Sequence, residues 1–294
     1  AFAKLFNINS KNVALIPSTS YGISVAAKNI QIYSDQKIIV LKDQFPSNVY
    51  PWFDLVKQRG GTVEILDVGN NGNITANLIN AIDERVAAVA IPNVRWTDGA
   101  LLNLNQIKEA CNGAGAKLIL DLTQSAGAMV TDLSAVQPDF AVIANYKWML
   151  GPYSTAFLYV GDNFLEGSPL EQTWSGRKDS DNFSKLTDYK FEYQPGASKF
   201  DMGERANFSL LPGVKVALDQ LNDWGIENIH YTLENNSTKL CADLRRMGLT
   251  ILSEEKRAPH FIGAKLPGNN GSRILSEFSK NKIYVSERSG YLRI

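Results

Sequence analysis

Short apolar runs rich in β-branched residues alternate with amphipathic segments over much of the chain. The runs are as long as single strands, and the intervening segments are long enough for helices. We expect strands at 37–41, 62–66, 86–91, 117–121, 139–143 and 155–160, and helices at 48–58, 75–83 and 105–113. Such a rhythm requires a mostly parallel sheet with helices on both faces. The sequence therefore predicts an α/β fold.

The pattern changes after a polar stretch at 161–206 that is rich in turn residues and contains Trp174. Beyond it we expect two long helices, at 214–224 and 226–247, and then short strands on either side of a helix at 272–281. This predicts a large domain at 1–210 and a small α+β domain at 211–294. A helix-like start at 2–6 and a strand-like end at 291–294 suggest that the chain is a piece of a longer product and that the small domain is incomplete.

Composition excludes several classes of function. Lys and Arg number 30, as do Asp and Glu, so the chain lacks the positive charge that nucleic acids or anionic membranes attract. The longest apolar runs are too short to cross a bilayer. The chain has two cysteines and two histidines, without a C-x-x-C pair or metal-ligand spacing. We therefore expect no metal, no nucleic-acid or membrane partner, and a reducing cytoplasmic location.

Two charged residues follow neighbouring strands of the predicted sheet. Asp121 ends the strand at 117–121, and Lys147 lies just beyond the strand at 139–143. Ligands bind at the carboxyl ends of parallel strands, so both side chains are expected at one edge. A lysine and an acid together suit pyridoxal phosphate, which needs an amine for its aldehyde and a carboxylate for its ring nitrogen. From spacing alone, unrelated loop charges remain the commoner explanation.

A phosphate site is also possible near the start of the chain. The segment 17–22 (PSTSYG) precedes a helix expected at 23–32 and offers hydroxyls and backbone N–H groups. An ordinary helix N-cap explains the same residues. A nicotinamide-binding fold is disfavoured, because Gly113-Ala-Gly115 precedes a strand and lacks the third glycine of the usual motif.

Two longer motifs resemble a known family. Residues 121–128 (DLTQSAGA) and 145–152 (NYKWMLGP) are similar to the core of class V aminotransferase-fold enzymes, which include cysteine desulfurases, isopenicillin-N-epimerase-like proteins and kynureninases. The likeness extends to 45–48 (FPSN), 95–99 (RWTDG) and the stretch 191–208, so it covers nearly the whole chain. It implies a type I pyridoxal-phosphate-dependent transferase fold and a homodimer.

The resemblance also implies roles for cofactor-binding residues. Lys147 matches the lysine that forms the Schiff base and then moves the substrate's α-proton, and Asp121 matches the partner of the pyridine nitrogen. Gln124 matches the contact to the ring oxygen, where kynureninases typically have histidine. Phe45 matches the residue that stacks on the ring, where desulfurases place a histidine that can also shuttle protons.

The remaining implied roles concern the phosphate, the substrate and the second subunit. Thr19, Ser20 and Tyr146 match the phosphate contacts. Arg293 matches an arginine that binds the substrate carboxylate, and Trp96 takes the position of a substrate contact. Asn207 lies in a loop that reaches a partner subunit's cofactor in relatives, although Glu204 replaces the threonine expected there.

These features favour a pyridoxal-phosphate-dependent enzyme that acts at the α-carbon of an amino acid, by transamination or epimerisation. A desulfurase would need a cysteine near 285–290, and that segment has none. Cys111 and Cys241 lie on predicted helices and are expected to be buried. A kynureninase-like C–C hydrolase remains an alternative. Alternatives of other classes are a non-catalytic relative and a nicotinamide oxidoreductase.

Overall fold

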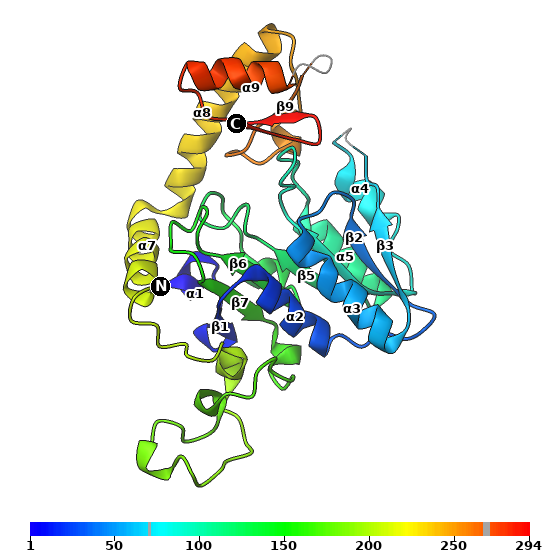
Figure 1. Ribbon diagram of the computed structural model, residues 1–294. Helices are drawn as coiled ribbons and strands as arrows, with labels where there is room; N and C mark the ends of the chain where they lie inside the picture. The colour runs from blue at the N-terminus through cyan, green and yellow to red at the C-terminus, as the bar shows by residue number, and fades with distance from the viewer. Residues whose placement is uncertain (70–71, 267–270) are drawn as a thin grey trace.

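The computed structural model describes residues 1–69, 72–266 and 271–294, and consists of a seven-stranded sheet covered by helices and a four-stranded sheet near the C-terminus. We call these the large sheet and the small sheet. Figure 1 shows the small sheet at one end of the molecule, and the polar stretch 161–206 projecting from the opposite end. The predicted α/β fold is confirmed. No helix in the described ranges is both long and apolar enough to cross a membrane.

The large sheet is parallel over five of its strands. In spatial order it consists of β1 (Val13–Ile16), β7 (Ala156–Val160), β6 (Phe140–Ala144), β5 (Lys117–Asp121), β4 (Val86–Pro92), β2 (Lys37–Leu41) and β3 (Thr62–Leu66). The neighbours from β6 to β3 pair in parallel, whereas β7 is antiparallel to both β6 and β1. The carboxyl ends of β4, β5 and β6 therefore meet at one edge, as the sequence predicts.

Both faces of the central strands β4 to β7 of the large sheet are buried, whereas the edge strand β3 is partly exposed. Along β5, Leu118 and Leu120 belong to one apolar core and Ile119 belongs to the other, because successive strand side chains point to opposite faces. The helices contributing to the first core are α1 (Phe2–Leu5), α4 (Ile74–Ile79), α5 (Leu104–Ala114), α6 (Leu133–Val136), α7 (Leu211–Trp224) and the first turns of α8 (Ile226–Arg246). Those of the second core are α2 (Thr19–Asn29) and α3 (Tyr50–Arg59). This two-sided burial explains why the strands read as continuous apolar runs.

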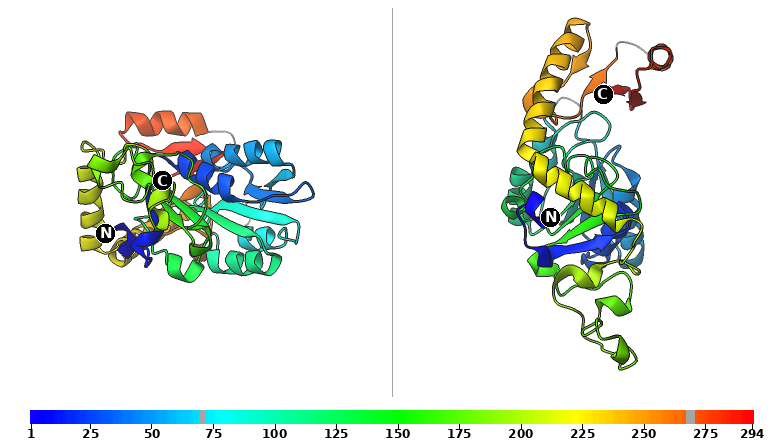
Figure 2. Two further views of the ribbon diagram at one scale, coloured as in Figure 1. Left: turned by 90° about the horizontal axis from the view of Figure 1, so that it is seen from below. Right: turned by 90° about the vertical axis from the view of Figure 1, so that its left-hand side faces the viewer.

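The small sheet is antiparallel and built from shorter strands. Its order is β10 (Ser286–Arg288), β11 (Tyr291–Arg293), β9 (Gly263–Lys265) and β8 (Thr250–Ile251), with α8 (Ile226–Arg246) and α9 (Gly271–Lys280) beside it. In Figures 1 and 2, α8 runs from α7 to this sheet. The buried face of α7 packs into the first core of the large sheet, where Val214 and Leu218 join Phe2. The domain division after residue 210 stays a prediction.

Among the local differences from the sequence expectation are the first strand and the start of α2. The sequence pattern did not reveal β1, which has only four residues. Helix α2 begins at Thr19, four residues earlier than expected, because the Ser18 hydroxyl caps it by accepting a hydrogen bond from the Tyr21 N–H at 3.2 Å. The earlier start brings the first turn of α2 to the edge of the large sheet.

Candidate active site

Most of the predicted site residues line one pocket at the carboxyl edge of β4 and β5. Asp121 is the last residue of β5, and Lys147 lies in the loop that follows β6. The lining residues are Thr19, Gln44, Phe45, Pro92, Val94, Trp96, Asp121, Thr123, Gln124, Tyr146 and Lys147. Two predicted residues lie outside this set: Ser20 is exposed next to Thr19, and Arg293 contacts Trp96 from the small sheet.

Lys147 lies among aromatic rings. Its Nζ atom is 5.7 Å from the centre of the Phe45 ring and 5.8 Å from that of Tyr146. Burial lowers the pKa of the Lys147 amine; the charge of Asp121 opposes this shift, and that of Arg293 adds to it. A larger fraction of the amine is therefore neutral at physiological pH than in an exposed lysine. A neutral amine can act as a nucleophile and as a base.

Asp121 is a buried carboxylate that forms no ion pair within 4.0 Å in the described part of the chain. Its side chain is 8 % exposed, and Oδ1 accepts a hydrogen bond from the Thr123 N–H at 3.0 Å. Burial raises the pKa of the Asp121 carboxyl, while Thr123 and Lys147 oppose the shift. None of the ion pairs within 4.0 Å in the described ranges involves Asp121. A ligand carrying a positive N–H group would satisfy this carboxylate.

Thr123 is not among the site residues predicted from the sequence. Its hydroxyl accepts a hydrogen bond from the Ala144 N–H at 3.2 Å and lies 3.3 Å from the Thr19 hydroxyl. It thus joins the ends of β5 and β6 to the start of α2. An Asp followed two residues later by Thr is the sequence signal of such a turn, but it also occurs in turns without any function.

Gly127 explains why the 121–128 and 145–152 segments contact each other closely. Its φ is +94°, and a Cβ atom at this position would lie 2.2 Å from the carbonyl oxygen of Trp148. Only glycine fits such a backbone and such a contact. On the other side, the Asn145 amide donates a hydrogen bond to the Thr155 hydroxyl at 3.1 Å. The loop that carries Lys147 is therefore held between β7 and the segment after β5.

The start of α2 can receive an anion. Thr19 is buried in the pocket, the first turn of the helix contains no acidic residue, and the Ser20 hydroxyl lies 3.0 Å from that of Ser18. On the other wall, Tyr146 stacks on Tyr153 with ring centres 4.0 Å apart. Burial raises the pKa of the Tyr146 hydroxyl, which therefore stays protonated and can donate a hydrogen bond. These donors suit a phosphate group.

Phe45 and Trp96 form an aromatic wall. Their rings meet edge to face with centres 5.6 Å apart, and the Trp96 indole donates to the Asp43 carbonyl at 2.6 Å. Gln44, which was also not predicted from the sequence, fixes the loop before Phe45: its amide donates hydrogen bonds to the carbonyls of Asn48 and Ala90. These contacts hold Phe45 with its ring beside Lys147, where a planar ligand could stack on it.

Arg293 reaches this wall from β11. Its guanidinium is 5.6 Å from the Trp96 ring centre and 5.0 Å from that of Phe261. Burial, helped by the charge of Arg288, lowers the pKa of Arg293, and its Nε atom is buried without a hydrogen-bond partner in the described ranges. The ion pairs found within 4.0 Å in these ranges leave Arg293 out. An incoming carboxylate would supply the missing acceptor.

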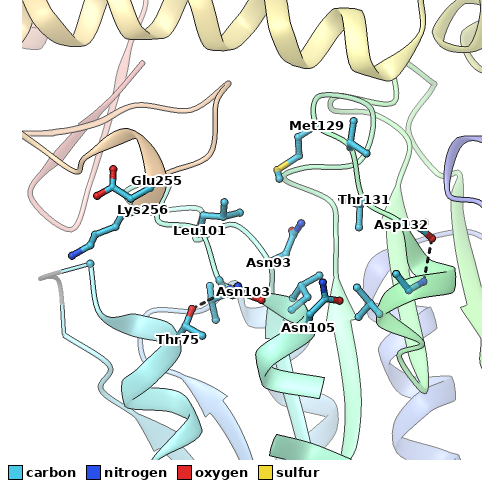
Figure 3. A pocket seen from close by; sticks show the side chains of 16 residues that line it. Thr75, Asn93, Leu101, Asn103, Asn105, Met129, Thr131, Asp132, Glu255 and Lys256 are labelled. Atoms are coloured by element: carbon cyan, nitrogen blue, oxygen red, sulfur yellow. Dashed lines mark hydrogen bonds between the residues drawn. The ribbon is translucent and has the colours of Figure 1, made fainter. Parts of the chain in front are cut away.

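A second pocket lies beside the site (Figure 3). Asn93, Leu101 and Thr131 line it, together with Lys256 from the segment before β9. Asn93 of this pocket accepts a hydrogen bond at 2.7 Å from the hydroxyl of Ser125, which follows Gln124 in the chain. No predicted site residue lines this pocket.

Comparison with known proteins places these motifs in a family. A family model described as aminotransferase class-V matches residues 1–291. Relatives include a probable cysteine desulfurase of Methanothermobacter thermautotrophicus, 27% identical over 77% of this chain and 55% of that protein. Another is an uncharacterized aminotransferase, YcbU, of Bacillus subtilis, 24% identical over 82% of this chain and 61% of that protein. The chain thus spans little more than half the length of such curated relatives.

The fold also matches solved structures. A mutant of C-DES with glycine covalently linked to its PLP cofactor superposes with a TM-score of 0.85, at 18% identity, over 99% of this chain and 77% of that one. At this identity the likeness concerns the fold. Together with the match of the family model to almost every residue, it shows that the chain belongs to the class-V aminotransferase family.

Proposed function

We propose that this chain binds pyridoxal phosphate and acts at the α-carbon of an amino acid, by transamination or epimerisation. The observation that carries the proposal is the pair in one pocket: a buried lysine whose pKa is lowered, and a buried carboxylate without a close cation. When bound, the cofactor supplies an electron sink for the negative charge left at the α-carbon.

The side chains of the pocket fit the cofactor group by group. Asp121 would hold the protonated ring nitrogen, whose positive charge would pair with the buried carboxylate. Gln124 would contact the ring oxygen. Phe45 offers a flat face for the ring. The phosphate would lie at the first turn of α2, on Thr19 and Ser20, with the Tyr146 hydroxyl as a further donor.

Lys147 would have two tasks in this proposal. Its neutral amine would hold the cofactor at its aldehyde group, and with a substrate bound the same amine would accept the proton from the substrate's α-carbon. Both tasks need an unprotonated amine, and burial among Phe45 and Tyr146 favours that form. In epimerisation or transamination, the proton is then returned to a carbon atom.

The substrate carboxylate would bind Arg293. A guanidinium offers two parallel N–H groups to a carboxylate, and here the ring contacts with Trp96 and Phe261 hold it in place. Trp96 would then form a wall of the substrate pocket, because it lies between Arg293 and Phe45.

Sulfur transfer is disfavoured even though some relatives are named desulfurases. That reaction needs a reactive thiolate, and both cysteines of the chain are buried, as expected from the sequence. Burial raises the pKa of Cys111 to about 12 and also raises that of Cys241. Neither residue lines the pocket of Lys147.

We also propose that the protein is a cytoplasmic homodimer. Large aromatic side chains are exposed on and beside the projecting stretch: Phe191 is 85 % exposed and Phe208 is 89 % exposed. Apolar surface of this kind is typical of an interface. Asn207 accepts hydrogen bonds from the Ser209 and Leu210 N–H groups, so it caps a turn here; a role at a partner's cofactor stays a prediction. Sedimentation equilibrium tests the dimer.

The test of the cofactor is the visible absorption spectrum after addition of pyridoxal phosphate and removal of the excess. We expect a yellow band that borohydride bleaches, with the reduced label on the peptide that contains Lys147. The Lys147→Ala variant should show neither the band nor the label, and Lys117→Ala, a lysine outside the pocket, should show both. A folded wild-type chain that stays colourless would contradict the proposal. Amino acids that shift the band then identify substrates.

A further inference from the structure

His260 is buried between the two sheets and contacts both cofactor-binding segments. Its Nε2 atom lies 2.6 Å from the carbonyl oxygen of Gln124, and its ring meets the Trp148 ring at 4.7 Å, at an angle of 77°. Trp148 is the neighbour of Lys147. His260 is not among the site residues predicted from the sequence, because no acid or metal ligand stands at a meaningful spacing from it.

The backbone around His260 connects the small sheet to the site on two sides. The Ala258 N–H donates to the Gly99 carbonyl at 2.8 Å, which ties this segment to the loop that carries Trp96. On the other side, Ile262 and Ile294 exchange two hydrogen bonds of 3.0 Å, one residue beyond Arg293. His260 therefore lies between the residues proposed to hold the cofactor, Gln124 and Lys147, and the strand that carries Arg293.

The contact fixes the tautomer of the ring. A carbonyl oxygen only accepts, so the Nε2 atom must carry the hydrogen. The Nδ1 atom is buried and has no hydrogen-bond partner in the described ranges. Adding a proton there would bury a cation with no acceptor, so the ring is neutral. The neutral His260 ring therefore holds the Gln124 peptide through one hydrogen bond and adds no charge to the site.

We propose that His260 is a positioning residue, which holds Gln124 and the Lys147–Trp148 peptide in register with the strand that carries Arg293. The part that concerns the cofactor rests on the function proposed above. The part that concerns Lys147 does not, since the contact with Trp148 exists in the chain itself. Without the imidazole, the Gln124 carbonyl loses its donor and Trp148 loses its edge-to-face ring contact.

The experiment compares three variants with the wild-type chain. His260→Leu removes the donor, His260→Gln keeps an N–H at a similar reach, and His230→Leu removes the other histidine of the chain, on α8. The first readout uses the cofactor-free protein: the pKa of Lys147, from the pH dependence of its modification by trinitrobenzenesulfonate, measured on peptides by mass spectrometry. The second is the affinity for pyridoxal phosphate, from fluorescence quenching. Melting temperatures accompany both.

We expect His260→Leu to raise the pKa of Lys147 toward that of an exposed lysine and to weaken cofactor binding about tenfold or more. His260→Gln should recover most of both effects, and His230→Leu should resemble the wild type. A folded His260→Leu chain with an unchanged Lys147 pKa and unchanged affinity would reduce His260 to a packing residue and overturn the proposal.

Nitrogen-15 NMR of histidine-labelled wild type, assigned with His230→Leu, decides the case in which His260→Leu does not fold. A neutral ring with hydrogen on Nε2, together with wild-type behaviour of His260→Gln, supports the proposal; a charged ring or hydrogen on Nδ1 overturns it. If the wild type binds no cofactor, the proposed function fails, while the pKa of Lys147 in the variants still tests His260.

Discussion

The two sides of the site are built in different ways. The side that would hold the cofactor consists of loops at the ends of β4, β5 and β6, strands that are buried on both faces. The side that would hold the substrate comes from the three-residue strand β11, whose Arg293 contacts aromatic rings and forms no ion pair within the described residues. We therefore expect the cofactor side, whose geometry is fixed, to govern the chemical step, and the substrate side, with Arg293, to govern substrate binding. Changes on the first side should lower kcat or stability, and changes on the second should raise KM.

Replacing Asp121 by Asn should give the largest effect on catalysis. An amide cannot keep the ring nitrogen protonated, so we expect kcat to fall by about 10³-fold. Stability should hold or increase, because Asn keeps an acceptor for the Thr123 N–H and removes a buried carboxylate that lacks a cation. Steady-state kinetics and calorimetry measure the two changes.

Asp35→Asn, a change of the same type at an exposed position, serves as the control and should alter neither quantity. Full activity of Asp121→Asn would remove Asp121 from the mechanism. A large loss of stability would show that the carboxylate has a partner cation in solution.

Gly127→Ala tests how firmly the cofactor side is fixed. The new Cβ would lie 2.2 Å from the Trp148 carbonyl oxygen at a φ of +94°, so the free energy of unfolding should fall by about 3 kcal/mol or more. Gly113→Ala in α5 is the matched control: its Cβ would meet nothing within 4 Å, and we expect a gain of about 0.5–1 kcal/mol. Urea denaturation gives both values, and equal stability of the two variants would contradict the contact.

The cofactor side could be predicted largely from sequence. Strands such as β4 and β5 are continuous apolar runs because both of their faces are buried, and Asp121 and Lys147 follow strands that pair in the expected order. The short strand β1 escaped notice because four apolar residues also suit a helix or a loop.

The contacts of the substrate side could not be predicted in the same way. Arg293 and Trp96 come together only through the pairing of β11 with β9 and the hydrogen bonds of the loop near Gly99, which no local pattern encodes. The role of His260 could not be predicted for a related reason. Its partner is a backbone carbonyl, and every residue has one, so the sequence does not show which carbonyl it contacts.

His260 also makes the junction of the two sides sensitive to acid. Burial lowers its pKa to about 4, with a contribution from the charge of His230, while the Gln124 carbonyl opposes the shift. Between pH 6.5 and 4 the histidine of the unfolded chain therefore takes up a proton that the folded chain does not, and stability should fall by up to about 3 kcal/mol.

Buried carboxylates act in the opposite direction over the lower part of this range. Burial raises the pKa of Asp98, Asp121 and Asp201, so the folded chain takes up protons there before the unfolded chain does. The difference in stability between wild type and His260→Gln, measured with urea from pH 7.5 to pH 4, isolates the histidine. A difference that does not change with pH would show that His260 titrates normally and is not enclosed.

Arg293→Lys should have a smaller effect than the changes at Asp121, Gly127 and His260, and it should act on substrate binding. A lysine keeps the charge but loses the paired N–H groups and the flat face that packs on Trp96 and Phe261, so we expect KM to rise about 10- to 100-fold with a smaller change in kcat. Arg288→Lys on β10, an exposed neighbour in the same small sheet, is the control and should leave KM within about twofold. A fall in kcat with an unchanged KM would mean that Arg293 acts on the reacting atoms, and the division of labour between the two sides would then be wrong.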